Sequence, residues 1–299
     1  MGESPLERGA LYLVATPIGN LGDLSPRALE VLRGVDWIAA EDTRHTRGLL
    51  ARFAVKTPLF SAHAHNERGR AREIAGRLLA GESGALVVDA GSPAISDPGE
   101  FVVKEVVAAG GLVRVVPGPS AVIAALSLSG LSTAAFTFTG FLPAKAGARD
   151  GRLAELLARQ ETLVVYEAPH RVRATLAALD RLAPGRPMAA CRELTKLHEE
   201  VLRGDAAAVL ARVTAERERG EWVLVIAGAS GAGEAPAAED APPATSTAAA
   251  GAEREGGDAA RARFIADQVA SGAGEEEARQ RAAFVLGPER PPRKGSKRT

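Results

Sequence analysis

Short apolar runs, each ended by glycine, proline or polar residues, recur along the chain as far as residue 228. Such runs are typical of strands that are buried on both faces of a sheet. Between them, apolar residues recur at the spacing of an amphipathic helix. The predicted strands are Ala10–Ala15, Trp37–Ala40, Ala85–Val88, Val113–Val116, Ala135–Thr139, Thr162–Tyr166, Met188–Arg192 and Trp222–Ala227. The predicted helices are Pro26–Leu32 after a Ser25 cap, Glu67–Leu79, Glu100–Ala109, a helix of small residues capped by Ser120, Gly151–Arg159, Arg171–Leu182 and Ala206–Glu218.

The order of these elements predicts an α/β fold. Strands and helices alternate through the first half, which indicates a doubly wound, largely parallel sheet. The alternation begins again after Gly130, so we expect a second α/β domain, with the ligand cleft between the two. The expected domains are residues 1–119 and 120–228.

The remaining residues have a different composition. Residues 229–258 contain no Val, Ile, Leu, Met or aromatic residue. Such a segment cannot bury a core, so we expect a disordered linker. For residues 259–299 we expect a short helical tail with a basic end, because Arg290 to Thr299 has five Lys or Arg residues.

The loop from Asp89 to Gly99 is the most informative segment. It follows a buried strand and contains two Gly, two Pro, two Asp and two Ser in eleven residues. Glycine lets the backbone approach a ligand closely, and proline holds a loop stiff. A loop of this length between a strand and a helix is usually functional. It has no Lys, and the chain has no GxxxxGK[ST] motif, so it is not a phosphate-binding P-loop.

Composition and charge exclude several classes of protein. Lys plus Arg and Asp plus Glu each number 37, so no overall basic field indicates a nucleic-acid partner. The single Cys191 excludes a disulfide framework and a cysteine-based metal site. Residues 115–144 carry no charge, but glycines and prolines interrupt them, which argues against a membrane span. The first ten residues lack the apolar segment of a signal peptide. We therefore expect a cytoplasmic protein with no membrane segment.

A set of motifs in a fixed order carries a family resemblance. They are TPIGN (Thr16–Asn20), AEDTRHT (Ala40–Thr46), HAHNE (His63–Glu67), the loop Asp89–Gly99, PGPS (Pro117–Ser120), GFLPAK (Gly140–Lys145), YEAPHR (Tyr166–Arg171) and RELTKLHEE (Arg192–Glu200). From about Leu11 to Gly228 the chain resembles the family of ribosomal RNA small subunit methyltransferase I, in the tetrapyrrole-methylase-like superfamily.

The resemblance implies two α/β domains of the tetrapyrrole-methylase type, with S-adenosylmethionine (SAM) in the cleft between them, and a homodimer. It implies transfer of a methyl group to the ribose 2′-oxygen of a cytidine in the decoding region of small-subunit ribosomal RNA. It also implies that a group of mostly small residues lines the cofactor pocket. These residues are Pro17, Gly91, Ser92, Ile95, Ser96, Ser120, Ala121 and Tyr166.

Methyl transfer to a hydroxyl needs in-line placement and a group that takes the proton. The sequence does not single out this base. The polar candidates that face the expected cleft are Glu41, Asp42, Arg44, His63, His65, Asn66, Glu167, His170, Arg171 and Lys196. If they lie in a strand, His63 and His65 share one face and with a carboxylate could hold a metal, but no third ligand has a fixed spacing, so we expect no metal. His170 and Arg171 are compatible with a helix start or with a surface turn.

Two other functions stay open at this point. A small-molecule methylase acting on a tetrapyrrole could use the same fold, because a fold does not determine a function. The segments AEDTRHT, HAHNE and YEAPHR argue against it. A non-catalytic RNA-binding assembly factor that has kept the fold is the third possibility, and measurement of cofactor binding would separate it from the two enzymes.

Overall fold

The structure is a computed structural model of the 299-residue chain, and it describes residues 6–64, 66–215 and 217–229. These residues belong to one unit of the chain, Met1–Ala238. The expected disordered linker and helical tail, from residue 230 onward, lie outside the described residues, as does the candidate His65.

The first sheet is entirely parallel. Its five strands are β1 (Ala10–Val14), β2 (Trp37–Ala40), β3 (Leu59–Ser61), β4 (Gly84–Val87) and β5 (Leu112–Val116). They lie in the order β3-β2-β4-β1-β5, and each neighbouring pair is parallel. The carboxyl ends of all five strands therefore lie at one edge, where the loops of the candidate site begin.

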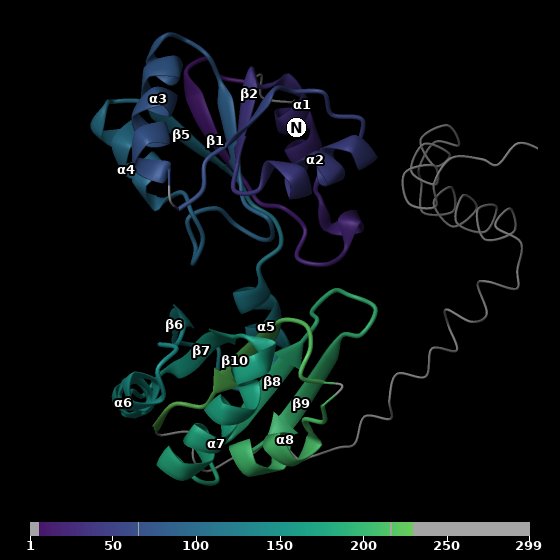
Figure 1. Ribbon diagram of the computed structural model, residues 1–299, viewed down its shortest axis with the longest axis vertical. Helices are drawn as coiled ribbons and strands as arrows, with labels where there is room; N and C mark the ends of the chain where they lie inside the picture. Colours follow the sequence, from purple (N-terminus) through teal and green to yellow (C-terminus); the bar gives the residue numbers. More distant parts are fainter. Residues whose placement is uncertain (1–5, 65, 216, 230–299) are drawn as a thin grey trace, which may run out of the picture. The chain divides into compact units, whose positions relative to one another are not determined.

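Helices cover both faces of this sheet. In Figure 1, α1 (Pro26–Gly34) and α2 (Thr43–Arg52) lie on one side, and α3 (Glu67–Leu79) and α4 (Glu100–Ala108) on the other. The prediction of a doubly wound parallel sheet is confirmed. The predicted cap of α1 is also present, because the Ser25 hydroxyl accepts a hydrogen bond from the amide of Ala28 at 3.1 Å.

The second sheet is mixed. Its strands are β6 (Phe136–Phe141), β7 (Thr162–Glu167), β8 (Met188–Arg192), β9 (Glu200–Gly204) and β10 (Trp222–Ile226), in the order β6-β7-β10-β8-β9. Only the pair of β6 and β7 is parallel, and the other three pairs are antiparallel.

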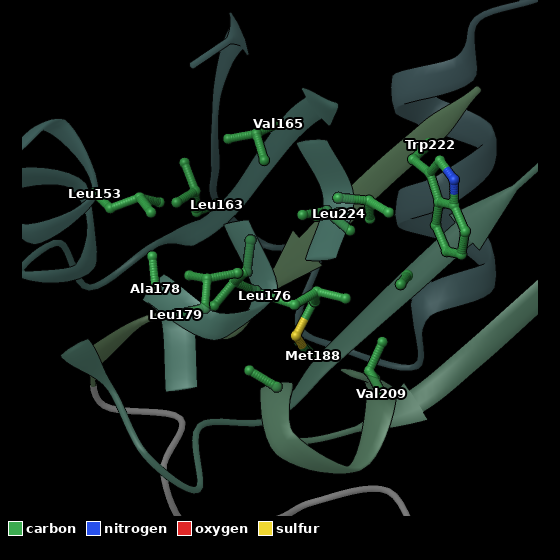
Figure 2. Close-up of a cluster of buried hydrophobic side chains, with 14 of the residues drawn as sticks. Leu153, Leu163, Val165, Leu176, Ala178, Leu179, Met188, Val209, Trp222 and Leu224 are labelled. Atoms are coloured by element: carbon green, nitrogen blue, oxygen red, sulfur yellow. The ribbon is translucent and has the colours of Figure 1, made fainter. Parts of the chain in front are cut away.

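The helices of the second half also cover both faces of their sheet. Helix α5 (Ala121–Ser129) packs against one face with Val122, Ala125 and Leu126. Helices α6 (Ala146–Leu157), α7 (Val172–Leu182) and α8 (Ala206–Arg212) pack against the other, in the core that Figure 2 shows. Because α5 packs against the second sheet, its contacts favour a domain boundary between residues 119 and 120. This boundary stays a prediction.

The uncharged segment 115–144 forms the end of β5, helix α5 and strand β6. Within the described ranges, none of the helices combines the length and the apolar character that a membrane crossing requires.

Several elements differ from the sequence prediction. Helix α2 and the edge strands β3 and β9 were not predicted, because their residues are polar or only partly buried and carry no clear period. Helix α6 begins at Ala146 rather than at Gly151, and the residue that its added N-terminal part buries is Arg149, which no apolar period signals. Helix α8 ends at Arg212, because Val213 is extended and the chain then turns.

Candidate functional site

The loop after β1 is tied to the long loop after β4. The amide of Thr16 donates a hydrogen bond to the carbonyl oxygen of Gly91 at 2.9 Å. In return, the amide of Gly91 donates to the carbonyl oxygen of Thr16 at 3.1 Å. The buried Thr16 hydroxyl donates to the Val88 carbonyl oxygen at 3.0 Å. These bonds join two loops that are 75 residues apart in sequence.

The long loop has an unusual backbone. Gly91 has φ +83°, and the non-glycine residues Ala94 and Ser96 have φ +68° and +63°. The left-handed region costs a non-glycine residue about 1 kcal/mol or more, so the surrounding structure must hold these residues there. The turn is closed by a hydrogen bond from the Ala94 amide to the Pro98 carbonyl oxygen at 3.1 Å.

Glu67 anchors the far end of this loop. Its side chain is buried, and Oε1 accepts hydrogen bonds from the amides of Gly99 at 2.8 Å and Phe101 at 3.0 Å. Both amides belong to the start of α4, where a carboxylate also interacts favourably with the helix dipole. The loop is therefore fixed at both ends, by Thr16 and by Glu67.

A cavity of about 480 Å³ lies against this loop. It is lined by loop residues of the first sheet, by the start of α5, and by residues at the ends of β6, β7 and β10. Every predicted cofactor residue except Pro17 lines it: Gly91, Ser92, Ile95, Ser96, Ser120, Ala121 and Tyr166. Pro17 lines a neighbouring hollow instead. The assignment of these residues to a cofactor stays a prediction.

Tyr166 is held by its aromatic neighbours. Its ring lies edge-on to those of Phe138 and Phe141, with centroid distances of 4.9 and 5.5 Å. Burial, together with the nearby Asp97 and Glu221 carboxylates, raises the pKa of Tyr166 to about 12. The phenol therefore stays protonated at neutral pH, and its O–H can act as a donor.

Three carboxyl groups meet at one side of the cavity, those of Glu41, Asp89 and Asp97. Burial raises the pKa of Asp97 to about 6, and the charges of Glu41 and Asp89 act in the same direction. Burial also raises the pKa of Glu41. Of the described residues that line the cavity, none is a Lys, Arg or His, so the lining itself places no cation beside these three acids.

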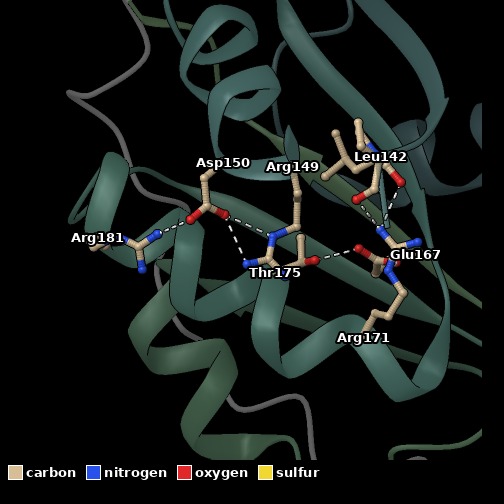
Figure 3. Close-up of polar contacts among 8 residues, drawn as sticks. Leu142, Arg149, Asp150, Glu167, Arg171, Thr175 and Arg181 are labelled. Carbon is tan, nitrogen blue, oxygen red and sulfur yellow. Dashed lines mark hydrogen bonds and ion pairs between the residues drawn. The ribbon is translucent and has the colours of Figure 1, made fainter. Parts of the chain in front are cut away.

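Glu167 also lines the cavity, but its carboxylate is occupied. Figure 3 shows it accepting a hydrogen bond from the Thr175 hydroxyl, at 2.5 Å, and the Ala168 amide donates to it at 2.8 Å. Arg171 Nε lies 3.2 Å from Oε1, yet this N–H has no hydrogen-bond acceptor. The distance makes the contact an ion pair, and the orientation of the N–H means that it is not also a hydrogen bond.

Arg171 links the loops after β6 and β7. Its Nη2 donates to the carbonyl oxygens of Leu142 at 2.8 Å and Pro143 at 3.0 Å. The pair of Glu167 and Arg171 therefore positions the cavity wall. These contacts leave the Glu167 carboxylate poorly suited to act as a base, while His170 beside it is exposed in a short 3-10 turn.

The neighbouring hollow has a different charge. It is lined by Arg44, His45 and Arg52 of α2 and by Lys196, and it shares Asp89 and Glu221 with the first cavity. Lys196 Nζ pairs with Glu193 at 2.9 Å and with Glu221 at 2.8 Å. Burial alone would lower the pKa of Lys196, but these two hydrogen bonds raise it. It therefore stays charged.

The other candidates that the structure describes do not line the first cavity. Asp42 caps α2 and pairs with Arg44 at 3.1 Å, and this arginine lowers the pKa of Asp42 to about 2. The Asn66 side chain accepts a hydrogen bond from the His63 amide at 2.9 Å. Strand β3 ends at Ser61, before His63, and His65 lies outside the described residues, so their sharing of a strand face stays a prediction. Among the described residues, no group of three or more His, Cys, Asp or Glu could hold a metal.

The sequence analysis did not select Asp89, Asp97 or Glu221 as site residues. The two aspartates were visible in the glycine- and proline-rich loop, but their importance depends on Glu41, which is 48 residues from Asp89 in the chain. Glu221 lies immediately before a predicted strand and belongs to none of the sequence motifs, so no sequence signal distinguished it.

Comparisons with known proteins agree with the resemblance. A family model described as tetrapyrrole (corrin/porphyrin) methylases matches residues 10–210. Ribosomal RNA small subunit methyltransferase I of Xylella fastidiosa (strain Temecula1) is 52% identical over 225 residues, which are 74% of this chain and 82% of that protein. The protein of the same name from Synechocystis sp. is 50% identical over 223 residues, 74% of this chain and 80% of that protein.

Solved structures bear on the fold. Uroporphyrin-III-C-methyltransferase from Thermus thermophilus matches with a TM-score of 0.53 at 23% identity, covering 75% of this chain and 96% of that chain. The two-sheet α/β architecture predicted from the motifs is thus confirmed. The chain belongs to the tetrapyrrole (corrin/porphyrin) methylases and, within them, to the family of ribosomal RNA small subunit methyltransferase I.

Proposed function

We propose that this protein transfers the methyl group of SAM to the ribose 2′-oxygen of a cytidine in the decoding region of small-subunit ribosomal RNA. The observation that carries the proposal is the pairing of two adjoining hollows that differ in their charged residues. Every charged residue that lines the first is acidic, whereas the second adds Arg44, His45, Arg52 and Lys196 to the shared Asp89 and Glu221.

The first cavity fits the methyl donor. Its volume of about 480 Å³ lies in the range of small-molecule sites. Gly91, at φ +83°, exposes backbone where a side chain would be strained. When bound, SAM supplies an electrophilic methyl group on a positively charged sulfonium sulfur. A cavity whose charged residues are all acidic suits such a cation, and the phosphate-binding lysine that a nucleotide would need is absent from its described lining.

The second hollow fits the phosphate backbone of RNA. Exposed arginines contact phosphates without reading sequence, and they bring the ribose of the bound strand to the rim of the first cavity. The protein has no net charge, so short RNA would be held weakly at physiological salt. We therefore infer that the substrate is folded RNA within a small subunit or its precursor, and that the enzyme acts in the cytoplasm.

We also propose a homodimer. Strand β5 and the following helix α5 expose large apolar side chains, including Leu112, Val115 and Ile123. Single exposed apolar residues are ordinary, but a group on consecutive elements is typical of an interface. Light scattering at micromolar concentration should give twice the mass of the chain, 30.9 kDa per copy.

The test of the reaction is methyl transfer from labelled SAM to purified small subunits that lack the modification. We expect the label on the ribose of a cytidine, identified by mass spectrometry of nucleosides and by resistance of the adjacent linkage to alkali. Short oligonucleotides of the same sequence should accept little label. Label on a base, or transfer to a porphyrinoid in preference to subunits, would refute the proposal. Absence of SAM binding by calorimetry would favour a non-catalytic assembly factor.

A further inference from the structure

We propose that Phe141 is the ring on which the base of the target nucleotide stacks when the RNA is bound. The inference rests on the proposed function and adds a contact to the substrate base. Phe141 lies in the segment GFLPAK, lines the first cavity and is 57% exposed. A single exposed apolar side chain is ordinary on a protein surface, but several separate features hold this ring in place.

A bulge in β6 gives Phe141 its direction. Phe138 pairs with Val164 of β7, and Phe141 pairs with Tyr166, so β6 holds one extra residue over this step. In a regular strand the side chains of Phe138 and Phe141 would lie on opposite faces. With the bulge, both rings contact the Tyr166 ring, at centroid distances of 4.9 and 5.5 Å. Bulges are frequent beside active sites, because they redirect a side chain.

The backbone on either side of Phe141 is also fixed. Gly140 has φ +66°, and a methyl group at this position would lie 2.6 Å from Ser96 Oγ. Glycine therefore lets the end of β6 approach the long loop closely. On the other side, Arg171 Nη2 donates to the carbonyl oxygens of the two residues that follow Phe141, at 2.8 and 3.0 Å (Figure 3). The position of the ring is thus set by the fold from both directions.

The fixed ring keeps an open surface. The Tyr166 ring lies edge-on to Phe141, with an angle of 60° between the two planes, yet more than half of the Phe141 side chain stays accessible. An exposed phenyl ring is stabilised when a flat aromatic partner removes water from its face. The structure therefore presents a rigid, uncharged stacking surface at the cavity.

The base of the target nucleotide is the partner that fits this surface. The reacting 2′-oxygen must reach the methyl group in the first cavity, and the base is bonded to the neighbouring ribose carbon, so it must lie close by. Proteins bind unpaired RNA bases by stacking them on aromatic rings. Charge favours the same orientation of the nucleotide. The acids of the first cavity would repel a phosphate but not a neutral base, whereas Arg44 and Arg52 of the second hollow attract phosphate.

The experiment measures single-turnover methyl transfer with saturating SAM and subsaturating small subunits that lack the modification. Phe141→Ala should lower the rate about 5- to 150-fold, the range that stacking of one base contributes. Phe141→Trp and Phe141→Tyr should recover most of the rate, because each keeps an aromatic face. Phe141→Leu should stay near Phe141→Ala, although it keeps apolar bulk. Phe136→Ala is the matched control, because Phe136 lies on the same strand, is 40% exposed and lines neither hollow. Its rate should stay within about twofold of wild type.

Two readouts do not depend on activity. The SAM affinity of Phe141→Leu, measured by calorimetry, should stay within about threefold of wild type, because the ring is assigned to the RNA base and not to the cofactor. Its mass by light scattering should equal that of wild type, because the ring is not assigned to an interface between copies of the chain. The order of rates, with both aromatic variants above leucine, is a pattern that a purely structural role of Phe141 would not produce.

Several outcomes would overturn the inference. One is a Phe141→Ala rate within about twofold of wild type, and another is a Phe141→Leu rate equal to that of Phe141→Trp. A loss of rate matched by weaker SAM binding would make Phe141 a cofactor contact, and a loss of rate matched by a lower mass would make it an interface residue. If wild type itself places no methyl group on ribose in small subunits, the proposed function fails, and the role of Phe141 fails with it. If wild type does so and the variants keep its rate, this inference alone fails.

Discussion

Glu67 should be the main anchor of the loop Asp89–Gly99, although it lies on a helix outside the cavity. Substitution of Glu67 by Ala removes the acceptor for the Gly99 and Phe101 amides. A hydrogen bond to a charged group contributes about 1.5–3 kcal/mol, and water can reach the start of α4 once the side chain is gone. We therefore expect Glu67→Ala to lower the free energy of unfolding by about 3 kcal/mol, and Glu67→Gln, which keeps an acceptor oxygen, by about 1 kcal/mol.

Urea unfolding followed by circular dichroism measures the effect, because a change in midpoint at constant slope reports stability alone. For a folded region of this size, 3 kcal/mol corresponds to a loss of roughly 6–12 °C in melting temperature. Glu73→Ala is the matched control on the same helix, where an exposed pair with Arg70 should contribute less than about 1 kcal/mol. A Glu67→Ala variant within 0.5 kcal/mol of wild type, as a rough limit of measurement, would refute the reasoning.

Three further substitutions test other parts of the structure. Ala121→Phe should weaken SAM binding at least tenfold in calorimetry with little change in melting temperature, because the added ring would fill a partly exposed part of the cavity. Glu167→Ala should destabilise the protein by about 3–5 kcal/mol in urea unfolding, since it leaves Arg171 without its buried partner. Gly84→Ala should lower the unfolding free energy by about 1–3 kcal/mol, because the new methyl group would lie 2.1 Å from the Trp37 ring.

Where the sequence carried a strong local period, the prediction of the fold was accurate. The bounds of Glu67–Leu79, Trp37–Ala40 and Met188–Arg192 agree with α3, β2 and β8. Apolar spacing alone decides such elements. Strand β9 was missed because Glu200–Gly204 contains charged residues at a sheet edge. The antiparallel pairing of β10 with β7 and β8 could not be predicted either, because the direction of a strand depends on partners far away in the chain.

The location of the candidate site could also be predicted from the sequence. Glycine and proline in the loop Asp89–Gly99 indicated a ligand site, and Gly91 and its neighbours Ser92, Ile95 and Ser96 do line a cavity. The chemistry within it was not predictable, because a pKa depends on burial and on neighbours. Burial raises the pKa of Asp97, and the charges of Glu41 and Asp89 add to this effect. The Glu167 carboxylate is occupied partly because α7 brings the Thr175 hydroxyl to it. Both facts require the folded arrangement.

The acidic character of the cavity has a consequence for the binding of the methyl donor. The described lining includes the carboxyl groups of Glu41, Asp89 and Asp97 and no Lys, Arg or His. SAM would bring a positive charge on sulfur into this partly buried site, where unlike charges attract more strongly than in water. Once its methyl group has left, the sulfur would be neutral and this attraction would be lost. The acidic lining therefore favours the methyl donor over its demethylated product, and a cation in the same wall would repel the donor.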